Sequence, residues 1–173
     1  MYNTDTPLVL GCTGHRPQKT PNYNYKKLYD LAVLYLKQYW PQEVISGAAL
    51  GWDTAIAEAA IDLDISLELA IPFIGQQDKW SLEDKKKYTY LLYKTNKLTV
   101  VDELAKYNPK AVQGYASWKL MQRNKYIVDT LSQQPNKLLL SFFDIENKNG
   151  GTAQCVRYAE TKDVVVINCW TSL

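Results

Sequence analysis

Apolar runs alternate with segments of helical period along most of the chain. The apolar runs predict strands at 7–12, 43–46, 67–71, 98–101, 137–143 and 163–168. The segments between them predict helices at 25–39, 51–63, 81–95, 116–131 and 152–161. Strands that alternate with helices in this way predict an α/β fold, with a mainly parallel sheet and helices on both of its faces.

Glycine gathers where these predicted strands lead into helices. In a parallel sheet, ligands bind beyond the carboxyl ends of the strands, so the loops at 11–17, 46–53, 72–80 and 143–152 are the ones to inspect. Tight turns alone could explain their glycines. The same loops, however, carry hydroxyls and an acid that phosphate or ribose would meet. These loops hold Gly11, Gly14, Gly47, Gly51, Gly75, Gly150 and Gly151, with Thr13, Ser46, Asp53 and Thr152.

Composition narrows the function classes. A length of 173 residues predicts one domain, 1–173. With 20 Lys and Arg against 18 Asp and Glu, the net charge is only +2, which argues against a nucleic-acid partner. No apolar stretch approaches the ~20 residues of a membrane span, and no secretory signal is visible, so we expect a cytoplasmic protein without a membrane partner.

Known cofactor and metal motifs are absent. The sequence contains neither G-x-G-x-x-G nor G-x-x-x-x-G-K-[ST], so a dinucleotide cofactor is not expected. Cys12, Cys155 and Cys169 are widely spaced, which predicts reduced thiols, no disulfide and no metal site.

Five blocks of sequence resemble one known family. They are TGHRP at 13–17, SGAALGWDTAIAEAA at 46–60, PFIGQQDKW at 72–80, QRNKYIVD at 122–129 and NGGTAQCVRYA at 149–159. In this order, along nearly the whole chain, they resemble the YpsA-like branch of the SLOG superfamily. The resemblance implies a Rossmann-like fold that binds nucleotides or nucleotide-derived small molecules, often as a sensor, and that forms homo-oligomers.

The chain departs from the hydrolases of that superfamily at one position. Related members sense NAD-derived signals in antiviral defence, whereas the "lonely guy" enzymes hydrolyse an N-glycosidic bond through a P-G-G-x-G-T-x-x-E signature. Here NGGTAQC places Cys155 where that glutamate would fall. A thiol cannot take the same proton at neutral pH without a strongly lowered pKa. Ligand binding without turnover is therefore expected, and no catalytic residue is assigned.

Each candidate side chain has a functional and a structural interpretation. Arg16 can bind phosphate or pair with a surface acid, and His15 can donate to the same phosphate or be a hydrogen-bonded structural histidine. Asp53 can bind ribose hydroxyls or stabilise the start of its helix. Arg123 and Asn124 lie among apolar residues, where they can hold a ligand or a ligand loop, or Arg123 can extend to solvent.

Two further candidates complete the predicted site. Phe73 can stack on a base, as Trp80 can, and Asp144 can meet a sugar hydroxyl or cap its own turn. The predicted ligand-binding residues are Gly11, Thr13, Gly14, His15, Arg16, Ser46, Gly47, Ala48, Gly51, Asp53, Pro72, Phe73, Arg123, Asn124, Asp144, Gly150, Gly151 and Thr152.

The main hypothesis is a stand-alone receptor or sequestering protein for a nucleotide-derived small molecule, such as an NAD-derived cyclic nucleotide signal. It would act in the cytoplasm, that of the host if a phage encodes it. Two alternatives stay open. One is an N-glycosidic-bond hydrolase that uses Asp53, Asp144 or Glu58 as its acid. The other is a DNA-binding protein related to the DNA-processing members of the superfamily.

Overall fold

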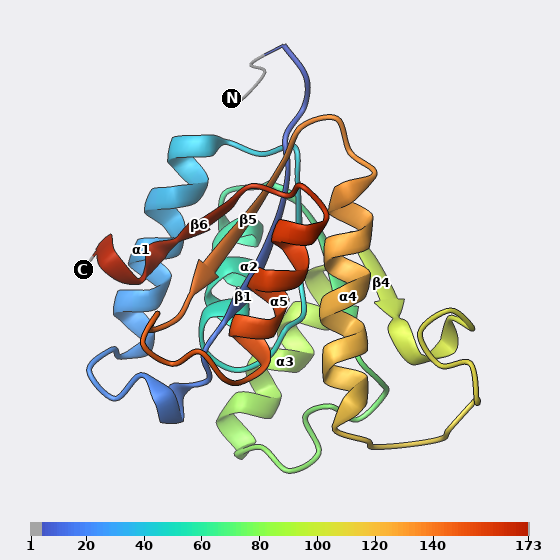
Figure 1. Cartoon of the computed structure of the whole chain (residues 1–173). Helices are drawn as coiled ribbons and strands as arrows, with labels where there is room; N and C mark the ends of the chain where they lie inside the picture. Colours follow the sequence, from blue (N-terminus) through green and yellow to red (C-terminus); the bar gives the residue numbers. More distant parts are fainter. Residues whose placement is uncertain (1–4, 173) are drawn as a thin grey trace.

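The computed structural model describes residues 5–172 and has the predicted α/β fold (Figure 1). Its strands are β1 (Val9–Gly14), β2 (Glu43–Ser46), β3 (Ser66–Ile71), β4 (Lys97–Val100), β5 (Lys137–Phe142) and β6 (Val166–Asn168). Its helices are α1 (Tyr25–Tyr39), α2 (Trp52–Asp62), α3 (Leu82–Lys94), α4 (Trp118–Ser132) and α5 (Gly151–Thr161), with short 3₁₀ turns at Pro17–Lys19, Val101–Glu103 and Cys169–Ser172. The fold class expected from the sequence is confirmed.

The strands form one parallel sheet in the order β4-β3-β2-β1-β5-β6. The chain first runs outward from β1 to β4 and then returns to place β5 on the other side of β1. The winding therefore reverses between β1 and β5. In sheets of this kind, a crevice opens at the carboxyl ends of the two strands where the winding reverses.

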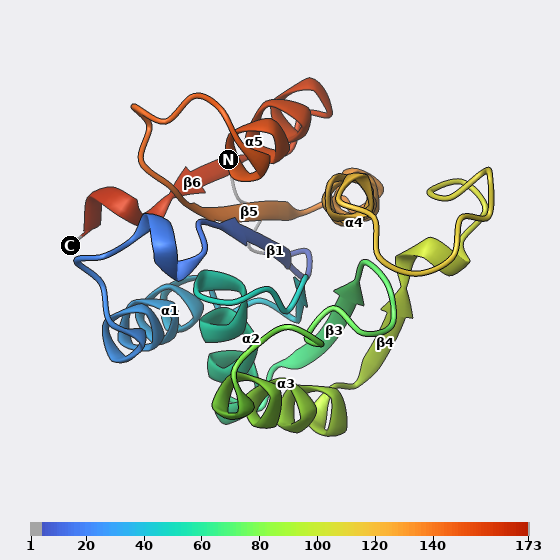
Figure 2. The ribbon, with the colours of Figure 1, turned by 90° about the horizontal axis from the view of Figure 1, so that it is seen from below.

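Helices cover both faces of the sheet. Figure 2 looks onto the edge where the strands end, with α1, α2 and α3 on one side and α4 and α5 on the other. Alternate residues of each strand enter opposite cores, because successive side chains in a strand point to opposite faces. In β1, Leu10 packs with the α1–α3 layer and Val9 packs with the α4–α5 layer.

Strand β1 ends at Gly14, later than the sequence predicts, and the packing of α4 against it decides the role of Gly11. Thr13 and Gly14 pair with β5 and continue the strand to residue 14. Gly11 is thus inside the strand, where a Cβ atom would lie 2.8 Å from Cδ1 of Leu131 on α4. Its absent side chain lets α4 pack close to the sheet. Gly11 belongs to the core and not, as predicted, to a ligand loop.

The last strand begins later than predicted, at Val166. The backbone of Asp163 has a φ of 57°, and the N–H of Val164 donates to the carbonyl of Ala159. These residues therefore end α5 and cannot yet join the sheet.

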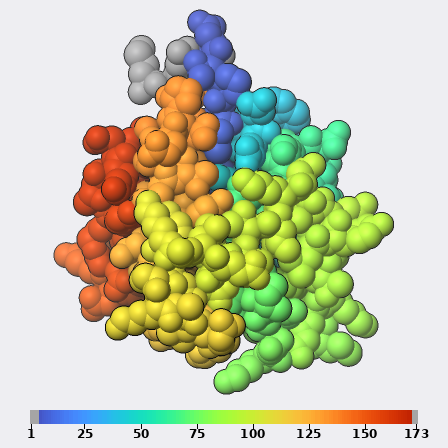
Figure 3. Space-filling view, turned by 90° about the vertical axis from the view of Figure 1, so that its right-hand side faces the viewer, coloured from blue at the N-terminus to red at the C-terminus, as the bar shows by residue number. Residues whose placement is uncertain are grey.

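The segment from 101 to 117 is the longest stretch without an α-helix or strand in the described part of the chain. Figure 3 shows it in yellow, on the face between α4 and the β3–α3 region. Its conformation depends on Lys119, whose side chain is buried. The ammonium group of Lys119 donates to the Asp102 carboxylate at 2.9 Å and to the carbonyls of Val112 and Gly114 at 2.8 and 2.6 Å. In the described residues, no helix has the length and apolarity that a membrane span requires.

Candidate functional site

A cavity of about 260 Å³ opens beyond the ends of β1 and β5, where the winding reverses. We call it the switch-point pocket. Five segments contribute to it, namely the end of β1 with the loop after it, the β2–α2 loop, the first turn of α2, one face of α4 and the start of α5. It is lined by Thr13, Gly14, His15, Arg16, Gln18, Lys19, Ala49, Asp53, Leu120, Arg123, Asn124, Gly151 and Thr152.

The start of α5 gives this pocket anion-binding character. The N-cap residue Gly150 has a φ of 106°, and no side chain caps the helix. The first backbone N–H groups of α5 thus keep their donor capacity and the partial positive charge of the helix N-terminus. The Nζ of Lys19 lies 3.1 Å from the position of a Cβ on Gly150, and Arg16 is exposed at the same pocket. Two cations and a helix N-terminus are typical of a phosphate site.

Arg123 forms the floor of the pocket from α4. Its Nη1 donates to the carbonyl oxygen of Gly47 at 2.6 Å, and its Nε donates to Oδ1 of Asn124 at 3.0 Å. A Cβ on Gly47 would lie 2.5 Å from Nη1. Gly47 therefore makes room for the guanidinium group of Arg123, a role that differs from the direct ligand contact predicted for it.

Asp53 lies beside Arg123 and is 5% exposed. Burial raises the pKa of its carboxyl group to about 6, although the Arg123 guanidinium, the N–H of Ala49 and the charge of Arg16 oppose that rise. The Sγ of Cys12 lies 3.8 Å from Oδ1 of Asp53. A carboxylate with this pKa changes charge close to neutral pH, at the floor of a basic pocket.

The β2–α2 loop is held by its own hydrogen bonds. The hydroxyl of Ser46 donates to the backbone carbonyl of Asp53 at 2.8 Å and accepts from the N–H of Ala48 at 3.2 Å. The backbone of Ala48 has a φ of 55° and that of Gly51 a φ of 90°. Ser46, Ala48 and Gly51 thus shape the loop, and none of the three lines the switch-point pocket.

His15 and Asp144 are joined to each other. The Nε2 of His15 accepts from the backbone N–H of Asp144 at 3.1 Å, so the proton of the neutral ring is on Nδ1. Burial, with a smaller contribution from Lys19, lowers the pKa of His15, so the ring is neutral at pH 7. The Asp144 carboxylate accepts from the N–H of Glu146 and caps its own turn. It does not line the pocket.

Cys155, at the position of the hydrolase glutamate, is buried under the pocket. Burial raises the pKa of this thiol to about 12, and a hydrogen bond with Thr13 offsets only part of the rise. The thiol therefore stays protonated at neutral pH. Among residues 5–172, no group of three His, Cys, Asp or Glu side chains could hold a metal ion.

The structure brings together half of the predicted site. Thr13, Gly14, His15, Arg16, Asp53, Arg123, Asn124, Gly151 and Thr152 line one pocket. Pro72 and Phe73 lie outside it, and the Pro72 carbonyl accepts from the N–H of Asp102. Sequence reasoning missed Gln18, Lys19, Ala49 and Leu120. Lys19 could have been found, because in a 3₁₀ turn that begins at Pro17 it lies three residues after Arg16 and on the same side.

A second cavity, of about 300 Å³, adjoins the switch-point pocket. We call it the aromatic groove. The two share Arg16 and Leu120, and the groove is otherwise lined by Phe73, Gly75, Gln76, Asp78, Lys79, Trp80 and Tyr115. The ring of Phe73 meets the ring of Tyr115 edge to face, and the ammonium of Lys79 lies 5.7 Å from the centre of the Tyr115 ring. The two adjoining cavities therefore bring basic and aromatic side chains close together, with Asp78 as an acidic residue in the groove.

Comparison with known proteins finds a similar sequence and similar folds. No protein-family model matches the chain. The chain is similar to the uncharacterised SPbeta prophage-derived protein YoqJ of Bacillus subtilis, with 28% identity over 123 residues, which are 67% of this chain and 68% of YoqJ. DNA processing protein A of Helicobacter pylori superposes with a TM-score of 0.54 and 17% identity, over 95% of this chain and 67% of that protein.

The same protein of Streptococcus pneumoniae superposes with a TM-score of 0.52 and 12% identity, over 96% of this chain. The chain has the fold of DNA processing protein A. It spans 60% of the length of the S. pneumoniae protein. This fold agrees with the coarser part of the resemblance to the SLOG superfamily, which includes DNA-processing members. Membership of the YpsA-like branch stays a prediction.

The expectation that nucleic acid is not a partner is wrong. The H. pylori protein of this fold binds single-stranded DNA. Net charge is a sum over the whole surface, whereas Arg16, Lys19 and Arg123 concentrate positive charge at one edge of the sheet. A net charge of +2 therefore does not exclude a basic binding site.

Proposed function

We propose that the protein binds single-stranded DNA, with a backbone phosphate in the switch-point pocket and an adjacent base on the aromatic groove. The observation that carries the proposal is Arg16, which lines both cavities. Single-stranded nucleic acid presents phosphates and unstacked bases side by side. Proteins bind it by pairing a basic groove with aromatic rings on which the bases stack.

The phosphate contact would come from both side chains and backbone. Arg16 offers a fork of N–H donors and Lys19 a second charge, while the uncapped start of α5 offers backbone N–H groups. Arg16 and Lys19 are exposed, so both can reach a ligand without unfolding. The likeness of fold to a protein that binds single-stranded DNA supports the same class of partner.

Fluorescence anisotropy with a labelled single strand of about 16 nucleotides tests the proposal, since a binding module of comparable size covers ~4–16 nucleotides. We expect affinity to fall as salt rises, because phosphate contacts release counterions. Replacing Arg16 by Ala removes a charge-assisted contact of roughly 1.5–3 kcal/mol, so affinity should fall about tenfold to a hundredfold.

Lys37→Ala is the matched control. Lys37 is exposed in the last turn of α1, at the opposite edge of the sheet. The K37A substitution removes one positive charge, as R16A does, at a residue that lines neither cavity. Equal losses from R16A and K37A would place the contact elsewhere, and binding that is indifferent to salt would contradict a phosphate site.

A nucleotide-derived small molecule is the second candidate ligand, and Asp53 favours it. Asp53 and Asn124 put acceptor oxygens inside the pocket, where ribose hydroxyls could donate to them and where a bare phosphate would gain nothing. Calorimetry with nucleoside monophosphates and NAD, followed by heating and chromatography of the recovered ligand, tests this function. Unaltered ligand supports a receptor or sequestering protein, and a released base supports the N-glycosidic hydrolase. Homo-oligomer formation likewise stays a prediction from the resemblance.

A further inference from the structure

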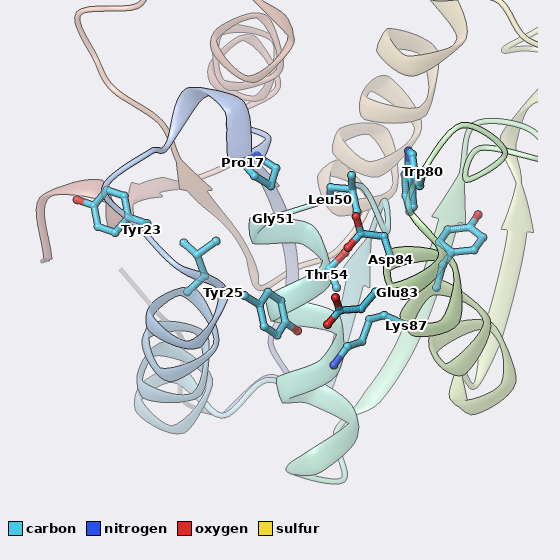
Figure 4. A pocket seen from close by; sticks show the side chains of 12 residues that line it. Pro17, Tyr23, Tyr25, Leu50, Gly51, Thr54, Trp80, Glu83, Asp84 and Lys87 are labelled. Atoms are coloured by element: carbon cyan, nitrogen blue, oxygen red, sulfur yellow. The ribbon is translucent and has the colours of Figure 1, made fainter.

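A third cavity, of about 320 Å³, lies among α1, α2 and α3 (Figure 4). We call it the interhelical cavity. Four aromatic side chains line it, together with two leucines. The aromatic residues are Tyr23, Tyr25, Trp80 and Tyr88. A flat apolar group of the size of a nucleobase suits such a lining, because rings bind to rings by stacking or by edge-to-face contact.

The charges at this cavity are opposite to those at the switch-point pocket. Figure 4 shows Glu83 and Asp84 reaching from α3 toward α2. Among the described residues, no hydrogen bond or ion pair engages either carboxylate. Lys87 also lines the cavity, but its ammonium donates to the Glu58 carboxylate at 2.6 Å and is thereby neutralised. Phosphate would be repelled here, whereas a neutral group that carries N–H donors would be bound.

The interhelical cavity adjoins both the aromatic groove and the switch-point pocket. Trp80 lines both this cavity and the aromatic groove. On the other side, Pro17 lines this cavity while the preceding residue, Arg16, lines the switch-point pocket. A Cβ on Gly51 would lie 2.9 Å from the backbone oxygen of His15 and 3.3 Å from Cδ of Pro17. Because Gly51 has none, the segment from His15 to Pro17, which contributes to both cavities, packs directly against it.

We infer that the interhelical cavity binds a nucleobase with an exocyclic amino group, from the strand whose phosphate contacts Arg16. This inference rests on the proposed binding of single-stranded DNA. A carboxylate accepts from the N4 amino group of cytosine, whereas thymine presents a carbonyl oxygen at the same ring position. Cytosine and thymine are both pyrimidines, so the comparison isolates hydrogen-bonding chemistry from ring size.

The test compares three labelled strands of about eight nucleotides, namely oligo-dC, oligo-dT and a fully abasic strand with the same phosphates. We expect oligo-dC to bind about tenfold more tightly than oligo-dT, in line with one good hydrogen-bonded base contact. The variant E83Q/D84N should reduce that ratio to about one. The control E160Q/D163N removes the same two charges from exposed positions at the end of α5 and just beyond it, and should leave the ratio unchanged.

The three strands separate the two proposals. If none of them binds in a salt-dependent way, the proposed function itself fails. If the abasic strand binds and R16A weakens it, but oligo-dC and oligo-dT bind alike, the function stands and the inference about the cavity is overturned. A preference for oligo-dC that survives in E83Q/D84N also overturns it, since another part of the protein would then read the base.

Discussion

Arg123 and Gly47 are 76 positions apart in the sequence, and Nη1 of Arg123 donates a 2.6 Å hydrogen bond to the carbonyl oxygen of Gly47. This bond joins α4, on one face of the sheet, to the loop that leads into α2 on the other. The guanidinium reaches that carbonyl because Gly47 has no side chain. The floor of the switch-point pocket is thus made where the two helical layers meet.

Replacing Arg123 by Met should destabilise the protein strongly. Arg123 is buried, and its removal leaves the charge of Asp53 and the carbonyl of Gly47 without their main partner. Leaving a buried acceptor without its donor costs about 1–3 kcal/mol, and more where a buried charge also loses the opposite charge beside it. Urea unfolding measures the loss. Lys125→Met, on the same helix, serves as control, and a loss equal to that control would show that the guanidinium contacts add no stability.

The contribution of Asp53 to the stability of the protein should fall as pH rises from about 4 to about 6. The pKa of Asp53 is about 6 in the folded chain against 3.8 for an ordinary aspartate, so in this window the folded state binds more protons than the unfolded state. Raising the pH therefore favours unfolding, by about 3 kcal/mol in total from this group. His15 opposes this effect, because its lowered pKa lets the unfolded chain bind a proton below about pH 6.5 that the folded chain does not bind.

Asp53→Asn provides the comparison for that pH dependence. The amide has nearly the shape of the carboxyl group and does not titrate. The difference in unfolding free energy between D53N and the parent protein should therefore rise, in favour of D53N, as pH goes from 4 to 7. A constant difference across this range would contradict the raised pKa of Asp53.

Lys119→Met should loosen the segment from 101 to 117. The buried ammonium holds three points of that segment. Its loss leaves the Asp102 carboxylate and the Gly114 carbonyl without this donor, and the Val112 carbonyl keeps only its hydrogen bond from the Asn108 side chain. We expect about 3 kcal/mol of destabilisation and faster proteolysis within the segment. Tyr115 lies in the same segment, so affinity for single-stranded DNA should fall as well. Lys110→Met changes an exposed lysine of the same segment and should do neither.

Alanine should destabilise the protein at Gly14 but not at Gly151. A Cβ on Gly14 would lie 2.5 Å from Cβ of the buried Trp52, so overpacking should cost about 1–3 kcal/mol. A Cβ on Gly151 would meet nothing within 4 Å, and alanine suits the first turn of α5. G151A should therefore melt no lower than the parent protein, yet bind DNA more weakly, because the added methyl group enters the pocket. Thermal melts measure the effect of each substitution on stability, and fluorescence anisotropy on the same samples measures its effect on DNA binding.

Much of the fold follows from the sequence because its signals are local. The stripe of Leu28, Leu31, Ala32 and Tyr35 identifies α1, and Ser81 accepts a hydrogen bond from the N–H of Asp84 at the start of α3, as the capping pattern predicts. The position of the site at the carboxyl ends of the strands also follows, because parallel strands bring their loops to one edge. These inferences require only the period of the pattern and the handedness of the connections.

The roles of individual residues in the site were decided by tertiary structure. Gly11, Gly47 and Gly151 are the same residue type in the sequence. In the structure, however, a Cβ atom on each would face α4, Arg123 and open space respectively. What a glycine permits depends on which atoms its Cβ would meet, and those atoms come from distant parts of the chain. Charge behaves in the same way. The net charge of +2 is a property of the whole chain. Folding places Arg16 and Lys19 beside the start of α5, and Glu83 and Asp84 at a separate cavity. These positions matter because electrostatic forces depend on distance in space and not on separation in sequence.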